Sequence, residues 1–138
     1  MSTVEENKEL INKLYEEYNK GNYGFYDECF SDDFVAYRPN ATLDKAGYKQ
    51  FLIFAQSLFP DIKRTIEDLI VTEDRAALYF TWIGTDSVGG DNRKPTGKVI
   101  KVKEIIFMSF KDGRISEFRP YGDQHSMLHQ LGMPLPEE

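Results

Sequence analysis

The residue best placed to do chemistry is Asp123, which follows the last strand-like segment of the sequence. Residues 114–121 are predicted to form a strand after a tight Asp112-Gly113 turn, so the chain delivers one carboxylate to the end of a sheet. In an apolar pocket a carboxylate can remove a proton from a carbon next to a carbonyl, because lost hydration raises the pKa of such a group. Aspartate is also a favoured helix N-cap, and Asp123 could serve in either role or both.

Two residues of the same strand could assist Asp123. Alternate positions of a regular strand share a face, so Arg119 and Tyr121 are expected on the side of Asp123. Arg119 could hold the carboxylate ionised or bind an anionic group of a substrate. Tyr121 could donate a hydrogen bond to an enolate oxygen. The alternative is an exposed arginine and a packed tyrosine.

A second carboxyl interrupts the apolar face of the preceding strand. Glu104 shares that face with Ile100, Val102, Ile106, Met108 and Phe110. An acidic group there must be paired or functional, because burying it alone is costly. Three interpretations are open: Glu104 lines a pocket, a bulge turns it outward, or it forms a structural ion pair.

No metal or nucleophile site emerges from the remaining candidates. His125 and His129 are four residues apart and could share one helix face, but a catalytic zinc usually needs a third protein ligand. A solvated helix face is therefore predicted, with no metal. Cys29 is the single cysteine, so no disulfide can form within the chain, as is usual in the reducing cytoplasm.

Composition narrows the class of protein. The chain has 138 residues and a net charge of −6, which fits one domain over residues 1–138 and argues against a nucleic-acid surface. The first residues lack the features of a signal peptide, and no apolar stretch is long enough to span a membrane, so we expect a cytoplasmic protein without membrane contact. Phe and Tyr are abundant, which indicates an aromatic core or an aromatic-lined pocket.

The expected elements are helices followed by strands. Helices are predicted over residues 3–20, 23–30 and 44–59, the first from the capping-box pair Thr3 and Glu6. Strands are predicted over residues 34–37, 62–72, 75–85, 98–111 and 114–121, with a glycine-rich loop at 87–97. This order predicts an α+β fold in which helices cover one face of a strongly bent antiparallel sheet, leaving a cavity between them.

Several short segments, in this order and spacing, resemble the SnoaL-like polyketide cyclase family of the NTF2-like superfamily over nearly the whole chain. They are Tyr37-Arg38-Pro39, Phe59-Pro60-Asp61, Gly84-Thr85-Asp86, Pro95-Thr96-Gly97-Lys98, Asp112-Gly113-Arg114-Ile115-Ser116-Glu117, Asp123 and Gln130-Leu131-Gly132. The resemblance implies a cone in which a curved mixed sheet surrounds a deep apolar pocket for a small apolar or aromatic molecule. It also implies a homodimer formed through the sheet.

The resemblance further implies a chemistry. Characterised family members close a polyketide ring by intramolecular aldol condensation without metal or organic cofactor, and an Asp at the position of Asp123 is the general acid/base. By the same analogy Tyr37, Arg38, Trp82 and Asp86 would line the pocket, with Trp82 alternatively in the core and Asp86 in a solvated turn.

This chain departs from the family pattern at three of these positions. Family members often have His where it has Tyr37 and Asp86, and Trp where it has Arg119. A different substrate or a changed reaction is therefore expected. A ketosteroid-isomerase-like isomerase and a non-catalytic binding protein for small ligands are the alternatives, because one fold can host many functions.

Overall fold

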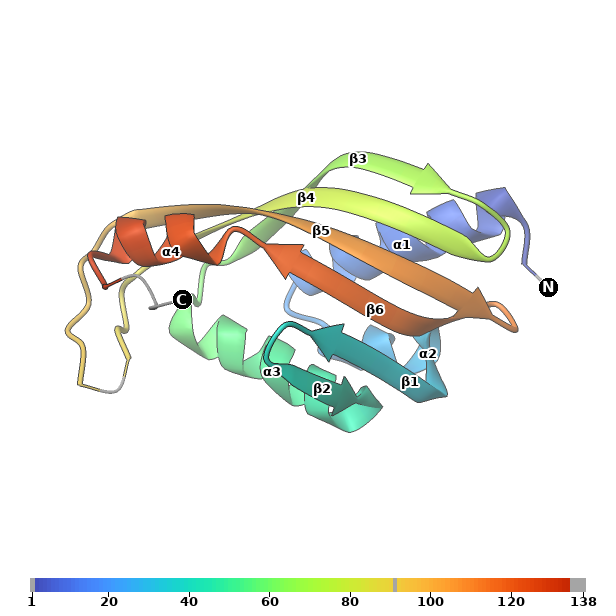
Figure 1. Ribbon diagram of the computed structural model, residues 1–138, viewed down its shortest axis with the longest axis horizontal. Coiled ribbons are helices and arrows are strands. Elements are labelled where there is room, and N and C mark those ends of the chain that lie inside the picture. Colours follow the sequence, from blue (N-terminus) through green and yellow to red (C-terminus); the bar gives the residue numbers. More distant parts are fainter. Residues whose placement is uncertain (1, 91, 135–138) are drawn as a thin grey trace.

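The computed structural model describes residues 2–90 and 92–134 and has an α+β architecture, as predicted (Figure 1). The helices are α1 (Val4–Asn19), the 3-10 turn η1 (Tyr23–Phe25), α2 (Tyr26–Cys29), α3 (Lys45–Leu58) and α4 (Gln124–Leu131). The strands are β1 (Phe30–Arg38), β2 (Ala41–Asp44), β3 (Lys63–Val71), β4 (Arg75–Thr85), β5 (Val99–Lys111) and β6 (Arg114–Gly122).

The six strands form one sheet in the order β2-β1-β6-β5-β4-β3. Every neighbouring pair is antiparallel except β1 and β6, which run parallel. The sheet is therefore mixed, as the family resemblance implied, whereas the order of the predicted strands alone suggested an antiparallel one. In Figure 1 the long strands β4 and β5 arch over α1 and α3, and α4 lies at the end of the sheet where β6 finishes.

Side-chain caps set the starts of the three longer helices. The Thr3 hydroxyl accepts from the Glu6 amide at 3.1 Å, and the Glu6 carboxylate accepts from the Thr3 amide at 3.2 Å, which completes the predicted capping box. Asp44 caps α3 by accepting from the Gly47 amide at 2.7 Å. Asp123 caps α4 in the same way. Each of these helices thus begins at a side chain suited to capping.

Strand β2 was not predicted from the sequence. This four-residue strand pairs with β1 across the turn at Pro39, and its side chains are mostly exposed. It therefore carries no alternation of apolar and polar residues by which a strand is recognised. Its effect is to lead the chain directly into α3.

The space between the sheet and the helices is filled at one end. The rings of Phe30, Phe34 and Tyr48 pack edge-on against Phe118 at centroid distances of 5.1, 5.3 and 5.4 Å. Aromatic pairs in this arrangement add to the stability that burial itself supplies. The opposite end, beneath the beginning of β5 and the end of β6, is hollow. No helix in the described part of the chain combines the length and apolar character needed to cross a membrane.

Candidate active site

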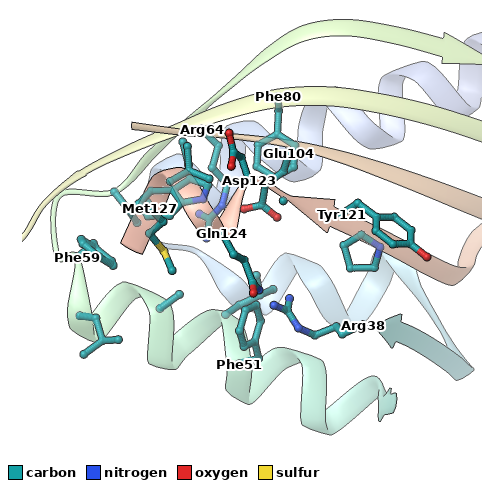
Figure 2. Close-up of a pocket in the computed structure, with 18 of the residues that line it drawn as sticks. Arg38, Phe51, Phe59, Arg64, Phe80, Glu104, Tyr121, Asp123, Gln124 and Met127 are labelled. Carbon is teal, nitrogen blue, oxygen red and sulfur yellow. The ribbon is translucent and has the colours of Figure 1, made fainter. Parts of the chain in front are cut away.

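A cavity of about 600 Å³ lies between the inner face of the sheet and helices α1, α3 and α4. Its size is within the range of small-molecule sites in proteins. Most of the lining is aromatic or aliphatic, including Tyr15, Tyr18, Tyr48, Phe51, Phe80 and Trp82. Figure 2 shows Arg64, Glu104 and Asp123 on one side of this cavity, with Arg38 and Phe51 across from them beside α3. The charged groups therefore lie within an otherwise apolar surface.

Asp123 lies at the rim of the cavity, between β6 and α4. Its Oδ1 accepts a hydrogen bond from the Ser126 amide at 3.0 Å, and its own amide donates to the Lys103 carbonyl at 3.1 Å. Its Oδ2 accepts no hydrogen bond from the residues that the structure describes. The cap and the cavity position therefore coexist: one oxygen orients the carboxylate and the other is available.

Glu104 occupies the inner face of β5, opposite Phe80 on β4 and Gly122 on β6. The register of β5 is regular here, so no bulge turns this side chain outward. A Cβ at Gly122 would lie 2.9 Å from the Glu104 Cγ, so the glycine leaves room for the acidic side chain. Burial raises the pKa of the Glu104 carboxyl, while Trp82 and the charges of Arg38 and Arg64 act in the opposite direction.

Arg64, which was not among the residues predicted from the sequence, lies on the inner face of β3 with only 7% of its surface exposed. Asn19 holds the backbone of Arg64 by two hydrogen bonds of 2.8 Å: the Arg64 amide donates to Asn19 Oδ1, and Asn19 Nδ2 donates to the Arg64 carbonyl. Its guanidinium donates one long bond, of 3.5 Å, to the Tyr23 hydroxyl and lies 5.3 Å above the Tyr18 ring. No acidic oxygen of residues 2–90 or 92–134 is within 4.0 Å of it.

Three tyrosines place hydroxyl groups in or beside the cavity. Those of Tyr15, Tyr18 and Tyr48 have no hydrogen-bond partner within the described ranges, and the Tyr18 oxygen is fully buried. Burial raises the pKa of all three hydroxyls, so they remain protonated and can donate. Tyr15 and Tyr48, which line the cavity, therefore carry unused donors, whereas the enclosed Tyr18 hydroxyl presents no surface to it.

Two residues predicted from the resemblance do line the cavity. Arg38 ends β1, and its guanidinium lies 4.0 Å from the centre of the Phe51 ring. Trp82 is buried on the inner face of β4 and packs against Phe59 at a centroid distance of 5.1 Å. The indole is thus part of the core and of the cavity wall at once.

Arg119, Tyr121 and Tyr37 lie on the outer face of the sheet instead of converging on Asp123. Arg119 and Tyr121 pair with Phe107 and Ile105, whose side chains are exposed. Tyr121 contacts the cavity rim, but its ring is 61% exposed and points away from the cavity in Figure 2. The Arg119 guanidinium lies 4.4 Å from the centre of the Tyr37 ring. Arg119 and Tyr121 do not share a face with Asp123, because Asp123 follows the end of the strand and the alternation of faces no longer applies there.

Asp86 is placed neither in the cavity wall nor in a solvated turn. Its side chain is 1% exposed and accepts from the Arg93 guanidinium at 2.7 and 2.9 Å. The amide and hydroxyl of Thr96 donate to it at 2.9 and 2.8 Å. These bonds hold the pKa of Asp86 well below its usual range, chiefly through Arg93. The carboxylate therefore fixes the loop between β4 and β5.

The two histidines are exposed on α4. In residues 2–90 and 92–134 no three His, Cys, Asp or Glu side chains are grouped so as to hold a metal ion. Cys29 is buried, and burial raises the pKa of its thiol to about 12. His125 is among the residues that line the cavity, whereas His129 and Cys29 are not.

One sequence signal could have revealed Arg64. The inner face of β3 and its approach alternates Ile62, Arg64 and Ile66, so a charged residue stands at an apolar position, as Glu104 does on β5. Tyr15 and Tyr18 gave no such signal, because tyrosines on the apolar side of a helix are ordinary core residues. The sequence does not show that the hydroxyls of Tyr15 and Tyr18 lack hydrogen-bond partners, because the tertiary fold determines which groups lie opposite them.

The profile of the SnoaL-like polyketide cyclase family matches residues 9–131, so the chain belongs to this family. The predicted resemblance is confirmed. No curated protein sequence matches the chain.

Solved structures agree with the family assignment. The chain is 29% identical to IdmH from Streptomyces antibioticus, a proposed polyketide cyclase, with a TM-score of 0.83 over 91% of this chain and 98% of that one. A proposed polyketide cyclase from Acidithiobacillus ferrooxidans is 24% identical, with a TM-score of 0.83 over 96% and 98% of the chains. AclR from Streptomyces galilaeus, a proposed hydroxylase, is 23% identical, with a TM-score of 0.87 over 98% and 89%. The last two likenesses establish the NTF2-like fold.

Proposed function

We propose that this protein is an acid/base enzyme that cyclises a small apolar carbonyl compound, with Asp123 as the general acid/base. The observation that carries the proposal is the Asp123 carboxylate itself. It lies at the rim of an aromatic-lined cavity, with Oδ1 oriented by the Ser126 amide and Oδ2 unengaged within the described chain. A fixed carboxylate with one available oxygen is suited to removing a proton from a bound carbon acid.

The proposed reaction is an intramolecular aldol addition, the ring-closing step of an aldol condensation. Asp123 takes a proton from a carbon next to a carbonyl, and the electron pair of the broken C–H bond passes into an enolate. The enolate carbon attacks a second carbonyl carbon of the same molecule, forming the new C–C bond and leaving an alkoxide. The alkoxide then takes the proton back from Asp123, so the carboxylate is regenerated and the proton balance closes.

Glu104 is proposed to contact the substrate as a hydrogen-bond donor. Its carboxyl faces the cavity beside Gly122, one residue before Asp123, and burial raises its pKa. A protonated carboxyl can donate to a carbonyl oxygen on which negative charge develops. The two carboxyls have different surroundings, which is how a pair of acidic groups divides the roles of base and acid. Activity should therefore fall as the pH rises through the raised pKa of Glu104.

The proposed substrate is an apolar or aromatic molecule. Trp82, Phe80 and Phe51 offer ring faces, and Arg38 is held over Phe51. The volume of about 600 Å³ suits a molecule of several fused rings or their linear precursor.

The test is proton exchange at a probe ketone. We expect the protein to accelerate the exchange of the α-protons of 2-tetralone in D₂O, followed by proton NMR. The Asp123→Asn variant keeps a good N-cap but removes the base, so acceleration should fall by about 10²- to 10⁴-fold. Asp112→Asn, in the β5–β6 turn, is the matched control and should behave as wild type. Full acceleration in Asp123→Asn would overturn the proposal, and binding without exchange would favour the non-catalytic alternative.

We further infer a homodimer in which the outer face of the sheet meets a second copy. That face carries the exposed apolar side chains Ile83, Ile105, Phe107 and Tyr121. Exposed apolar surface gathered on one face is typical of protein contacts. Sedimentation of wild type and Phe107→Glu tests this, since the charge should yield monomers. Monomeric wild-type protein at micromolar concentration would exclude the dimer.

A further inference from the structure

We propose that the end of the cavity around Arg64 and Tyr18 binds a carboxylate group carried by an otherwise apolar substrate. The inference rests on the proposed use of this cavity as the substrate site and adds the class of substrate: an aromatic or polycyclic carbonyl compound that also carries a carboxylate, rather than a neutral ketone or ester. It does not depend on Asp123 being the base, so the two proposals can be tested apart.

The first support is the unpaired state of Arg64. A guanidinium has five N–H donors, and this one makes a single long bond of 3.5 Å to Tyr23. The side chain is 7% exposed, and no acidic oxygen of the described chain lies within 4.0 Å. A buried charge without a partner costs free energy unless something compensates it. Asn19 fixes the backbone of Arg64 on both sides, so this position is a built feature of the fold.

The second support is the Tyr18 hydroxyl, which is independent of the first. Its oxygen is fully buried and has no hydrogen-bond partner among the described residues. Burial keeps the hydroxyl protonated, so what it lacks is an acceptor. The Arg64 guanidinium lies 5.3 Å above the ring of the same tyrosine. The free donors of Arg64 thus adjoin a second unused donor, which a ligand reaches only if the Tyr18 side chain shifts.

A carboxylate is the group that these donors fit best. The planar guanidinium presents paired N–H groups that match the two oxygens of a carboxylate, and a remaining lone pair can accept from a hydroxyl. The surrounding walls, formed by Tyr15, Phe80 and Trp82, are aromatic and call for an apolar body behind the acid group.

Arg38 is less suited to this role, although it lines the same cavity. It is of intermediate exposure and is engaged with the Phe51 ring at 4.0 Å. It also acts more strongly than Arg64 on the Glu104 carboxyl. A charge that is partly hydrated gains less from an anionic ligand than one that is fully enclosed. Arg38 therefore provides the matched control for Arg64.

The experiment compares a carboxylate with its neutral isostere. Isothermal titration calorimetry of 2-naphthoate and 2-naphthamide should show the acid binding about 10- to 100-fold more tightly to wild type, the range of a hydrogen bond to a charged group. Arg64→Met should lose this preference and keep its affinity for the amide. Arg38→Met should keep most of the preference, and Tyr18→Phe should reduce it by about 3- to 10-fold.

The outcomes separate the two proposals. Failure of wild type to favour the acid, or an undiminished preference in Arg64→Met, overturns the carboxylate site. If Arg64→Met does not fold, its affinity for 2-naphthamide also disappears. The carboxylate site is then tested by the preference of wild type for 2-naphthoate over 2-naphthamide and by the reduction of that preference in Tyr18→Phe. Asp123→Asn should bind 2-naphthoate as wild type does, so its loss of proton exchange tests only the catalytic proposal.

Discussion

The loop between β4 and β5 and the cavity each enclose one carboxyl and one guanidinium, but they use them in opposite ways. In the loop, Asp86 and Arg93 form a bidentate pair at 2.7 and 2.9 Å. In the cavity, Glu104 and Arg64 form no ion pair, because no guanidinium nitrogen of Arg64 lies within 4.0 Å of a carboxylate oxygen of Glu104. The carboxyl and the guanidinium are thus paired with each other in the loop, whereas in the cavity they form no ion pair and are available to a ligand.

The pKa shifts of the two carboxyls express this difference. Hydrogen bonds from Arg93 and Thr96 lower the pKa of Asp86, whereas burial raises the pKa of Glu104. A pKa lowered by partners means that the charged carboxylate stabilises the folded protein, and a pKa raised by burial means that the charged carboxylate destabilises it relative to the neutral form. Charged groups that lack partners inside a cavity are the ones that a ligand can still satisfy.

The largest expected effect is the loss of the satisfied pair. Asp86→Ala leaves Arg93 and Thr96 without their acceptor and should lower the free energy of unfolding by about 2–4 kcal/mol, measured by urea denaturation at neutral pH. Asp33→Ala, which removes the exposed pair with Lys111, is the control and should have a much smaller effect, because solvent screens an exposed ion pair. An equally small effect for Asp86→Ala would remove the distinction between the two regions.

The next effect concerns Glu104 and has the opposite sign. Because its pKa is raised by folding, the native state binds a proton more tightly than the unfolded state does, and this stability is lost as the pH rises through the raised value. Glu104→Gln should therefore be more stable than wild type at neutral pH and should lack that decline. Thermal melts of both proteins across this pH range measure it. A variant that melts lower than wild type at neutral pH would indicate that Glu104 is paired after all.

The smallest effect is predicted at Arg64. Arg64→Met replaces an unpaired buried charge by an apolar side chain of similar length, so stability should change by less than about 1 kcal/mol or increase. Arg93→Met, which strands the buried Asp86 carboxylate, is the matched comparison and should be clearly destabilising. Urea denaturation of the two variants side by side is the measurement. A large loss in Arg64→Met would mean that the guanidinium holds the fold together and is not kept for a ligand.

Local patterns in the amino-acid sequence determined much of this protein by themselves. The capping residues and the apolar stripe set the helix limits, and the alternation along residues 100–110 marked Glu104 as a carboxyl at an apolar position. Only the register of β5 excluded the bulge that would turn it outward. The tight turn and strand before Asp123 fixed that residue at the end of the sheet. These features depend on neighbours within a few residues, which is why the α+β class and the family resemblance could be predicted.

Only the tertiary structure decided which charges have partners. Asp86 meets Arg93 because the intervening loop folds back. The groups that meet Arg64 are the Asn19 side chain, the Tyr23 hydroxyl and the Tyr18 ring, and none of them is acidic. Likewise Arg119 lies outside because the register of β5 and β6 assigns its face, which counting back from Asp123 could not do. Sequence alternation separates two faces of a strand, but long-range packing determines what stands opposite each side chain.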